Sequence, residues 1–257
     1  MPKVDYHIRE LNIRDIPLSS TWIMIGSPGS GKTCMLKNMI LYLRDRYPVG
    51  RAFVGSEKAY KYMCSIFQPL FVSNYYNEKE VISAIDRQKQ CNLENVEGYM
   101  GNYQMLVFDD VTDDVTIFNK PWIKAIFKLG SQHWNQLAIF CLHYALDMPT
   151  DIRKSVSYVA IFQDPNEDNR KKLYNNFGGI CGTYDKFCKF MDELTGNYMC
   201  MIIDNRNQST NVEDRVFYFK GDDIQDSFDF GCKEYKKWNS DRYNTSYKEE
   251  IFTWNVK

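Results

Sequence analysis

The stretch 26–33 constrains the fold of this chain more than any other part of the sequence. It reads Gly-Ser-Pro-Gly-Ser-Gly-Lys-Thr and fits the pattern G-x-x-x-x-G-K-[ST] at every fixed position. The apolar run 21–25 before it is typical of a buried strand, and apolar residues recur at helical spacing in 34–47 after it. A glycine-rich loop between a strand and a helix brings backbone N–H groups close to a polyphosphate. The stretch therefore predicts a parallel α/β fold with a phosphate-binding loop.

This loop predicts a site for a nucleoside triphosphate and Mg²⁺. Lys32 is expected to reach the β- and γ-phosphates and to serve catalysis, and Thr33 is expected to bind the metal. The residues expected to contact the nucleotide are Gly26, Ser27, Pro28, Gly29, Ser30, Gly31, Lys32, Thr33 and Cys34. The alternative interpretation is a glycine-rich turn that opens a helix without a ligand.

Composition limits the classes of protein to which this chain can belong. Its 257 residues, of which 44% are hydrophobic, suffice for one α/β domain with extensions. The net charge of −1 provides no strong overall field for nucleic acid, so any DNA contact is expected to be local. The eight cysteines include no C-x-x-C pair, which favours free thiols in a reducing compartment. No apolar stretch approaches the ~18 to 20 residues of a membrane helix, so no integral membrane segment is expected.

A second motif, residues 104–110, is an apolar run that ends in two acids. Ligands of an open parallel sheet bind at the carboxyl ends of its strands, so these acids are expected beside the phosphate loop. Asp109 is predicted to hold Mg²⁺, directly or through water, and Asp110 to polarise the attacking water as a general base. The alternative is a strand followed by an ordinary turn. Asp113 and Asp114 are interpreted as solvated loop acids or a helix cap, with metal ligands as the alternative.

Two further residues are candidates for roles around the γ-phosphate. The buried run 137–142 ends at His143, the position where additional-strand ATPases keep a γ-phosphate sensor. The alternative for this residue is a strand-end histidine that bonds a backbone carbonyl. Arg153, in a charged turn before the next strand, is predicted to enter a neighbouring subunit's site and to stabilise transition-state charge there. The alternative is a solvated arginine near a helix end, and Arg170 is the reserve candidate for the same role.

Strand and helix patterns alternate along most of the chain, which predicts a mainly parallel central sheet flanked by helices. Strands are expected at 51–55, 69–73, 104–108, 137–142, 156–162, 198–204 and 215–220, the last two forming a C-terminal β-hairpin. Helices are expected at 34–47, 57–66, 78–90, 121–129, 166–177 and 184–194. Residues 91–102 are interpreted as a polar surface insertion.

The predicted domain organisation is one P-loop ATPase domain followed by a tail. The domain covers residues 1–220, with its core at about 20–220 and a lead-in edge strand in 1–19. The tail, 221–257, interleaves basic and aromatic residues that could contact DNA, but acids dilute its charge. The favoured interpretation is a helical or extended segment that packs on the core or on a neighbouring subunit.

Taken together, these motifs resemble a known family. The features that carry the resemblance are Ile-Pro before the first strand, the loop at 26–33, Val-Phe-Asp-Asp at 107–110, the polar end of the next strand, Ile-Arg-Lys-Ser at 152–155 and the terminal hairpin. They are similar to the viral genome-packaging ATPases of the FtsK–HerA superfamily, above all to the group of poxviruses, other nucleocytoplasmic large DNA viruses and virophages. The chain differs from the poxvirus-type pattern at His143, where relatives carry glutamine, and at Gln132, where they carry arginine.

The resemblance implies a P-loop NTPase of the additional-strand type, with ATP and Mg²⁺ as cofactors. The implied activity is ATP-driven translocation of double-stranded DNA, without sequence specificity, into a preformed capsid by a pentameric or hexameric ring of identical subunits. The implied partners include a component of the capsid vertex or inner membrane. The implied location is the host cytoplasm, in the virus factory, and the virion. The residues by themselves support only Mg²⁺-dependent hydrolysis of a nucleoside triphosphate.

Three other functions share parts of this pattern. A nucleoside or nucleotide kinase would share the phosphate loop, but the paired aspartates suit water activation better than acceptor binding. A GTPase would carry the base-reading element N-K-x-D, whereas residues 119–122 read Asn-Lys-Pro-Trp. A nucleotide-dependent assembly factor that does not hydrolyse is disfavoured because Lys32, Thr33, Asp109 and Asp110 are all present.

Overall fold

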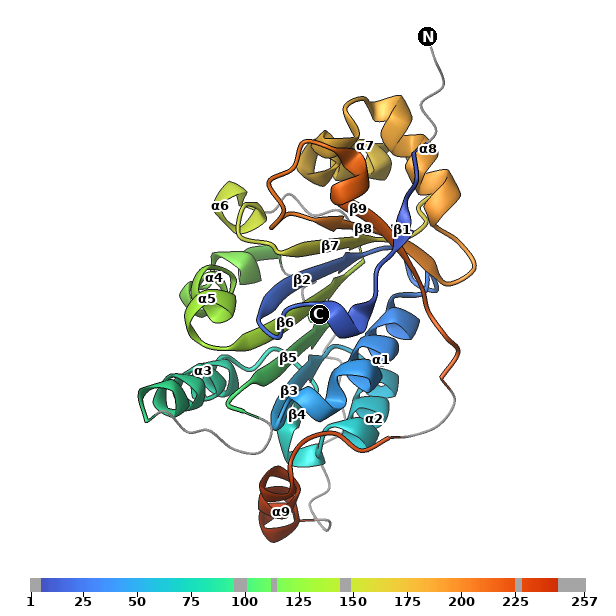
Figure 1. Ribbon diagram of the computed structural model, residues 1–257. Helices are drawn as coiled ribbons and strands as arrows, with labels where there is room; N and C mark the ends of the chain where they lie inside the picture. Colours follow the sequence, from blue (N-terminus) through green and yellow to red (C-terminus); the bar gives the residue numbers. More distant parts are fainter. Residues whose placement is uncertain (1–5, 95–100, 112–114, 144–148, 225–227, 245–257) are drawn as a thin grey trace, which may run out of the picture.

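A nine-stranded sheet runs through the described part of the molecule (Figure 1). The computed structural model describes residues 6–94, 101–111, 115–143, 149–224 and 228–244. In chain order the strands are β1 (Arg9–Glu10), β2 (Ser20–Ile25), β3 (Val49–Val54), β4 (Val72–Ser73), β5 (Gln104–Asp109), β6 (Gln136–Leu142), β7 (Tyr158–Ile161), β8 (Met199–Asp204) and β9 (Val216–Lys220). The helices are α1 (Lys32–Leu43), α2 (Glu57–Ile66), α3 (Glu78–Leu93), α4 (Pro121–Ala125), α5 (Ser131–His133), α6 (Thr150–Arg153), α7 (Glu167–Phe177), α8 (Tyr184–Leu194) and α9 (Lys233–Arg242).

The order of the strands decides where a ligand can bind. From one edge to the other the order is β1-β9-β8-β7-β2-β6-β5-β3-β4. The strands from β7 to β4 are parallel to one another, whereas β8 is antiparallel to both β7 and β9. Strand β6 lies between β2, which precedes the phosphate loop, and β5, which ends in the acidic pair. This inserted strand is the additional strand, and the predicted fold class, including the C-terminal hairpin, is confirmed.

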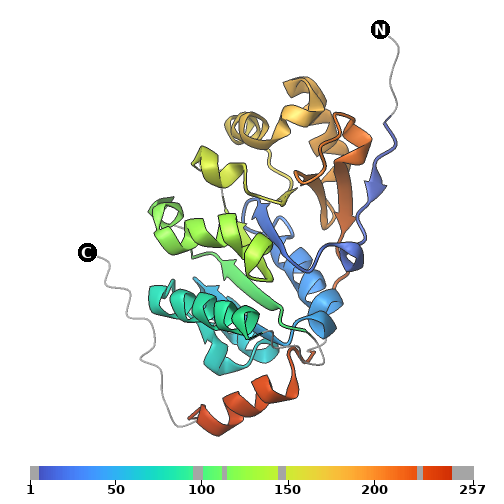
Figure 2. The ribbon, with the colours of Figure 1, turned by 60° about the vertical axis from the view of Figure 1, so that its left-hand side comes forward.

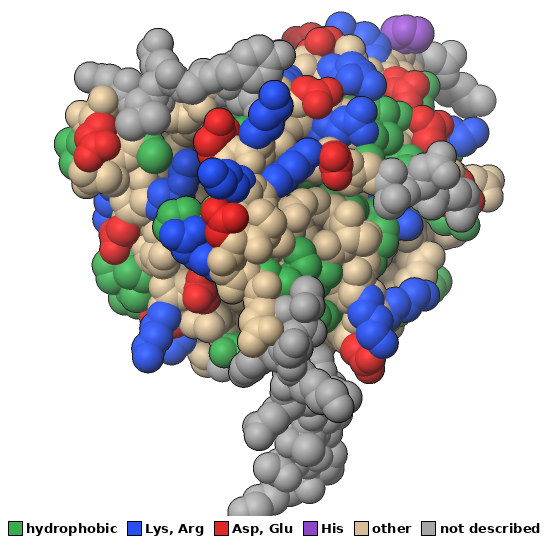
Figure 3. Space-filling view, turned by 90° about the horizontal axis from the view of Figure 1, so that it is seen from below, with side chains coloured by type: hydrophobic (Ala, Val, Ile, Leu, Met, Phe, Trp, Pro, Cys, Tyr) green, Lys and Arg blue, Asp and Glu red, His purple; other side chains and the backbone are tan. Residues whose placement is uncertain are grey.

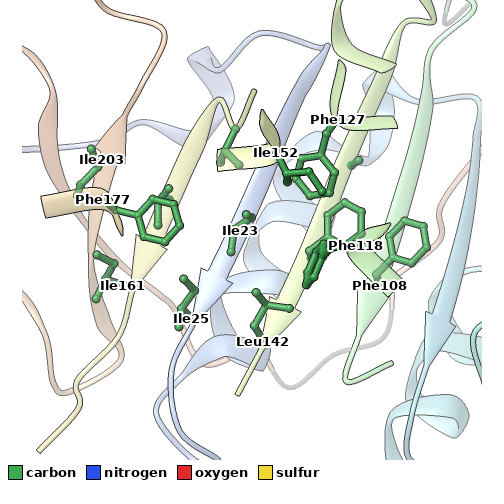
Figure 4. Packing of buried hydrophobic residues seen from close by; sticks show 14 of the residues in the cluster. Ile23, Ile25, Phe108, Phe118, Phe127, Leu142, Ile152, Ile161, Phe177 and Ile203 are labelled. Atoms are coloured by element: carbon green, nitrogen blue, oxygen red, sulfur yellow. The ribbon is translucent and has the colours of Figure 1, made fainter. Parts of the chain in front are cut away.

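Two apolar layers cover the two faces of the sheet. Successive side chains of a strand point to opposite faces, so Ile23 of β2 joins the layer with α3, α4, α7 and α8, and Trp22 joins the layer with α1, α2 and α9. Figure 4 shows the first layer. Within it the rings of Phe108 and Phe140, from β5 and β6, stack with their centroids 4.4 Å apart. Because the central strands are buried on both faces, they read as continuous apolar runs and hold their carboxyl ends in place.

The N-terminal strand and the C-terminal hairpin meet at one edge of the sheet. Strand β1 pairs in parallel with β9, with Arg9 opposite Phe217, and Figure 2 shows the blue N-terminal strand beside the orange hairpin. The edge strand predicted within 1–19 is therefore present, although it is only two residues long. Residues 1–5 lie outside the described part of the chain.

Three predicted elements differ from the structure. Residues Pro69–Phe71 form a 3-10 turn rather than the start of a strand, because Pro69 has no N–H to donate to a neighbouring strand; only β4 follows. The helix predicted at 121–129 continues to the end of α5 through a π-helical segment, Ile126–Gly130, whose wider turn keeps Ile126 and Phe127 buried. Helix α3 is longer than predicted, so the polar insertion starts after it, and its residues 95–100 lie outside the described part.

The described part of the C-terminal tail packs against this chain's own sheet near β3. Helix α9 buries Tyr235, whose hydroxyl donates to the Gly50 carbonyl at 2.9 Å. The Leu70 N–H donates to the side-chain oxygen of Asn239, on the same helix, at 2.9 Å. These contacts show that α9 is part of the folded core, whereas residues 245–257 lie outside the described part.

The surface gives no broad field of one charge on the face that Figure 3 shows. Among the described side chains of this face, Lys and Arg are interspersed with Asp and Glu. A DNA contact on this face would therefore depend on local groups of basic residues. Among the described helices, none combines the length and the apolar character needed to cross a bilayer.

Candidate nucleotide site

Three chain segments converge at the carboxyl edge of the parallel strands. The phosphate loop follows β2, Asp109 and Asp110 close β5, and His143 follows β6. The Gly26 N–H at the start of the loop donates to the Leu142 carbonyl at the end of β6, at 3.2 Å. Together with the loop, both aspartates and the histidine line a cavity of about 590 Å³. The structure therefore brings together all of the predicted site residues except the arginine.

The loop has the shape and the open hydrogen-bonding groups that suit an anion. Gly31 has a φ of +109° and leads directly into α1, a conformation that residues with side chains rarely adopt. The first N–H groups of a helix have no acceptor within the helix and are available to a phosphate. The hydroxyl oxygen of Ser30 is buried and has no hydrogen-bond partner. A phosphate oxygen is an acceptor that would satisfy this hydroxyl, so the loop fits the ligand that its sequence predicts.

Lys32 is buried at the floor of the cavity, with 8% of its surface exposed. Its ammonium donates to the carbonyl of Gly26 and, at 3.0 Å, to that of Ser27. The same Nζ lies 3.4 Å from Nδ1 of His143. Burial lowers the pKa of Lys32, and the negative charges of the acidic pair partly oppose this effect. Lys32 is thus a desolvated cation held by neutral oxygens, which a phosphate can replace with charged ones.

Asp109 and Thr33 provide the oxygen ligands expected of a magnesium site. Both residues line the cavity. Burial raises the pKa of the Asp109 carboxyl, the neighbouring charge of Asp110 raises it further, and a hydrogen bond from the Cys141 thiol opposes the shift. A carboxylate that lacks solvation gains from a nearby cation. Because Mg²⁺ binds one or two protein oxygens and completes its shell with water and phosphates, these two residues fit it.

Asp110 is held by its backbone and by His143. Its φ of +58° lies in the left-handed region, and its carbonyl packs so closely on Gly55 that a Cβ there would lie 1.9 Å from the Asp110 oxygen. Oδ1 of Asp110 contacts Nε2 of His143, and both side chains are about one third exposed or less. His143 therefore contacts Asp110 and lies beside Lys32, so it bridges the predicted base and the phosphate-binding lysine. Its role as a γ-phosphate sensor stays a prediction.

Arg153 lies far from this cavity, at the amino ends of the parallel strands, whereas the cavity lies at their carboxyl ends. It ends α6, just before β7. The Ser157 N–H bonds to the Thr21 carbonyl at 2.9 Å, which places this segment at the amino ends of the parallel strands. The guanidinium donates to the side chain of Asn176. Arg153 cannot reach the phosphate loop of its own subunit from this position, so only a neighbouring subunit could receive it.

Arg170, the reserve candidate, is held within its own subunit. Its Nε donates to the Asp164 carbonyl at 2.7 Å, and its terminal nitrogen pairs with the Asp192 carboxylate at 2.7 Å. The side chain is 17% exposed. These contacts tie α7 to α8 and leave the guanidinium less available for a second subunit than that of Arg153.

Several residues of the cavity have no recognisable pattern in the sequence. They come from α1, from α2 and its N-cap, and from the turn before β8: Lys37, Ser56, Lys58, Ala59, Tyr62, Met63 and Tyr198. Lys37 lies on α1 one helical turn after Thr33, so helical spacing alone could have predicted that it is near the loop. The remaining residues are brought to the loop only by the order of the strands, which the local patterns do not encode.

The comparison with known families agrees with this site. Residues 12–228 match the family described as Poxvirus A32 protein. The chain belongs to this family. The matched range contains the phosphate loop, the acidic pair, His143 and the C-terminal hairpin of this A32-family chain. The family relationship expected from the motifs is therefore confirmed.

Individual relatives agree with the family assignment. Protein 075L of Invertebrate iridescent virus 6 is 34% identical over 229 residues, which cover 88% of this chain and 87% of that protein. Protein 088R of Invertebrate iridescent virus 3 is 34% identical over 221 residues, which cover 84% of this chain and 82% of that protein. Among solved structures, the genome packaging NTPase B204 from Sulfolobus turreted icosahedral virus 2, in complex with AMPPCP, matches with a TM-score of 0.55 at 12% identity. The match covers 80% of this chain and 100% of that chain and shows a shared fold.

Proposed function

We propose that this A32-family chain is an ATP-driven motor that moves double-stranded viral DNA into a preformed capsid. It hydrolyses ATP with Mg²⁺ in the cavity between the phosphate loop and the acidic pair. The observation that carries the proposal is that Lys32, Asp109 and Asp110 line one cavity at the mouth of this loop. The B204 packaging NTPase, which shares the fold, has been solved with AMPPCP and with ATP-gammaS.

The residues of the site have separate roles in hydrolysis. Lys32 binds the β- and γ-phosphates, because its buried ammonium donates to the neutral carbonyl oxygens of Gly26 and Ser27 and can exchange them for charged phosphate oxygens. Asp110 accepts a proton from the attacking water, and His143 orients its carboxylate. Mg²⁺ held by Thr33 and Asp109 would neutralise charge that develops on the phosphates.

The proposed assembly is a homo-oligomeric ring. Among the described residues that line the cavity, the cations are lysines, and no arginine is present. P-loop NTPases gain a large part of their rate from an arginine, which can come from the same subunit or from a neighbour. A ring in which each subunit presents Arg153 to the next one would complete the site and make hydrolysis depend on assembly.

The proposed substrate of the motor is duplex DNA of any sequence. A translocating motor must hold every sequence alike, so phosphate contacts should dominate and base readout should be absent. Binding should therefore fall steeply with salt. A capsid vertex or inner-membrane component as docking partner, and the virus factory and virion as locations, complete the proposal.

The test is phosphate release from ATP by the full chain, with and without duplex DNA, in Mg²⁺ and after its removal with EDTA. The motor hydrolyses ATP, is stimulated by DNA of any sequence and stops without Mg²⁺. Lys32→Ala should remove turnover by weakening ATP binding, whereas Lys61→Ala, a change at a lysine whose side chain is 73% exposed on α2, should not. Turnover that needs a small phosphate acceptor would identify a kinase instead, and ATP binding without turnover would identify an assembly factor.

A further inference from the structure

We infer that Tyr198 is the aromatic side chain on which the base of the bound nucleoside triphosphate stacks. The inference rests on the proposed nucleotide site and adds the group that holds the base. The phosphate loop, the proposed metal ligands and the proposed general base Asp110 lie on one side of the cavity. Tyr198 lines the same cavity. It is an aromatic residue of this lining whose side chain is largely exposed, at 58% of its surface.

The strand order places Tyr198 on the correct side of the phosphate loop. Asp109 and His143 follow β5 and β6, on one side of β2, whereas Tyr198 precedes β8, on the other side. In the proposed nucleotide site the γ-phosphate faces Asp109 and Asp110, so the nucleoside would extend from the loop in the opposite direction. That direction leads toward the turn that carries Tyr198.

The backbone around Tyr198 is fixed against the loop and the start of α1. Its carbonyl accepts a hydrogen bond from the Gly221 N–H at 3.1 Å. A Cβ placed on Gly31 would lie 3.6 Å from the Tyr198 Cα. The Cys34 thiol, one residue after the phosphate loop, donates to the Asp222 carbonyl at 3.3 Å. These contacts hold the main chain of Tyr198 beside the start of α1, and the Tyr198 ring remains accessible to solvent.

The turn holds Tyr198 in a conformation that its residue type disfavours. The N–H of Met199 donates to the Gly196 carbonyl at 2.8 Å, so Asn197 and Tyr198 are the two central residues of a tight turn. Both have positive φ, +48° and +63°, as in a type I′ turn. Asn suits the first position, but Gly is strongly preferred at the second. A bulky residue held in the left-handed region is strained, and such strain is typical of functional positions.

A tyrosine ring at this point suits a base because stacking requires only a flat aromatic face. Stacking of a nucleobase on an aromatic side chain contributes about 1–3 kcal/mol and tolerates different bases. The phosphate loop already fixes the triphosphate, so the ring would add affinity for nucleosides without binding the phosphates. The ligand class assigned to this subsite is therefore the base of a nucleoside triphosphate, without preference for one base.

The experiment measures the affinity of the full chain for MgATP and for inorganic tripolyphosphate by calorimetry. Tyr198→Ala should weaken ATP binding roughly tenfold, since 1.4 kcal/mol corresponds to a factor of ten. Tyr198→Phe, which keeps the ring, should stay close to the original affinity. Tripolyphosphate, which has no base, should bind the original chain and all three variants, Tyr198→Gly included, equally well.

Tyr198→Gly separates the binding role from a structural one. Glycine is the preferred residue at this turn position, so this variant should melt a few degrees higher than the original chain in the absence of nucleotide. It should nevertheless lose ATP affinity as the alanine variant does. Tyr75→Ala is the matched control, because Tyr75 is also 58% exposed but does not line the cavity. It should change ATP affinity by less than about twofold.

The outcomes distinguish this inference from the proposed function. If the original chain binds and hydrolyses ATP while Tyr198→Ala binds ATP with unchanged affinity, the stacking role of Tyr198 is wrong and the proposed function stands. A loss of tripolyphosphate affinity equal to that of ATP would show that Tyr198 supports the loop rather than the base, and would also overturn the inference. If the original chain does not bind ATP at all, both proposals fail together.

Discussion

Charged side chains have different partners at the amino ends and at the carboxyl ends of the parallel strands. At the amino edge the Asp204 carboxylate accepts from the Arg206 guanidinium at 3.2 and 2.9 Å, and the buried amides of Gln136 and Gln104 bond each other at 2.9 Å. At the carboxyl edge, Lys32 bonds to carbonyl oxygens and forms no ion pair with the described carboxylates. At the amino ends the Asp204 carboxylate is paired with an arginine, whereas at the carboxyl ends Asp110 contacts His143 and Lys32 forms no ion pair with a described carboxylate.

The charged groups at the carboxyl ends are destabilised by burial, as the directions of their pKa shifts show. Burial lowers the pKa of Lys32 and raises that of Asp109, so each group is less favourable in its charged form than it is in water. The charged forms of these groups become more stable when a phosphate binds beside Lys32 or a cation binds beside Asp109. The amino edge therefore contributes to stability, whereas the carboxyl edge keeps charges available for a ligand.

The largest expected effect is a loss of turnover on substitution of Arg153, a residue of the amino ends with a proposed catalytic role. Arg153 lies at the amino edge, yet it is proposed to act on the nucleotide of a neighbouring subunit. Arg153→Ala should leave ATP affinity almost unchanged and reduce turnover of the assembled protein by roughly 10³ to 10⁵. Steady-state phosphate release and equilibrium ATP binding measure the two effects. Lys154→Ala, at the adjacent exposed position, is the control and should retain turnover.

Mixing experiments decide whether this arginine acts between subunits. An Arg153→Ala protein mixed with an Asp110→Asn protein forms some interfaces that combine an intact base with an intact arginine. Part of the activity should then return. Two inactive proteins that stay inactive after demonstrated co-assembly would place Arg153 with the structural residues of its edge, and the comparison would hold without exception.

The next effect concerns the general base at the carboxyl edge. Asp110→Asn should bind ATP but reduce turnover by roughly 10² to 10⁴, because an amide cannot accept the proton of the attacking water. Its nucleotide-free melting temperature should change little. Asp45→Asn, at a carboxylate whose side chain is 90% exposed, is the control. Near-normal turnover of Asp110→Asn would remove the base assignment.

A smaller effect is expected at the amino edge, and it should appear in stability alone. Asp204→Asn breaks the pair with Arg206, whose side chain is 39% exposed and so keeps some solvent. The free energy of unfolding should fall by about 1–2 kcal/mol, and the turnover per folded protein should stay the same. Urea unfolding measures the loss, with Asp241→Asn, at an exposed position of α9, as the control. A loss of turnover at constant stability would show that this edge also serves catalysis.

The smallest effect has the opposite sign. Asp109→Asn removes a buried charge that burial and Asp110 both disfavour, so the nucleotide-free protein in EDTA should gain about 1 kcal/mol at pH 7. Because the folded pKa of this carboxyl lies above its unfolded value, the original chain recovers stability as the pH falls through the folded pKa. The advantage of the variant should therefore shrink in acid. Unfolding curves at several pH values would contradict the comparison if Asp109→Asn were destabilised at every pH.

Much of the fold and the centre of the site were predictable from local patterns. The phosphate loop is defined by consecutive residues, and the apolar run before Asp109 reads as a strand because it is buried on both faces. The helix predicted at 121–129 was too short because a π-helical segment leaves no signature in the apolar spacing. Similarly, residues 69–73 contain the apolar side chains of a strand, but the proline at their start limits pairing.

The sequence by itself determined the chemistry of the phosphate loop and of the acidic pair, because within each motif the functional groups lie on neighbouring residues. Only the tertiary structure decided which distant residues join them. Strand order put His143 against Asp110 and Tyr198 on the far side of the loop, and it put Arg153 at the opposite edge of the sheet. Pairing between strands is non-local, and a buried apolar strand carries the same pattern whichever neighbour it acquires.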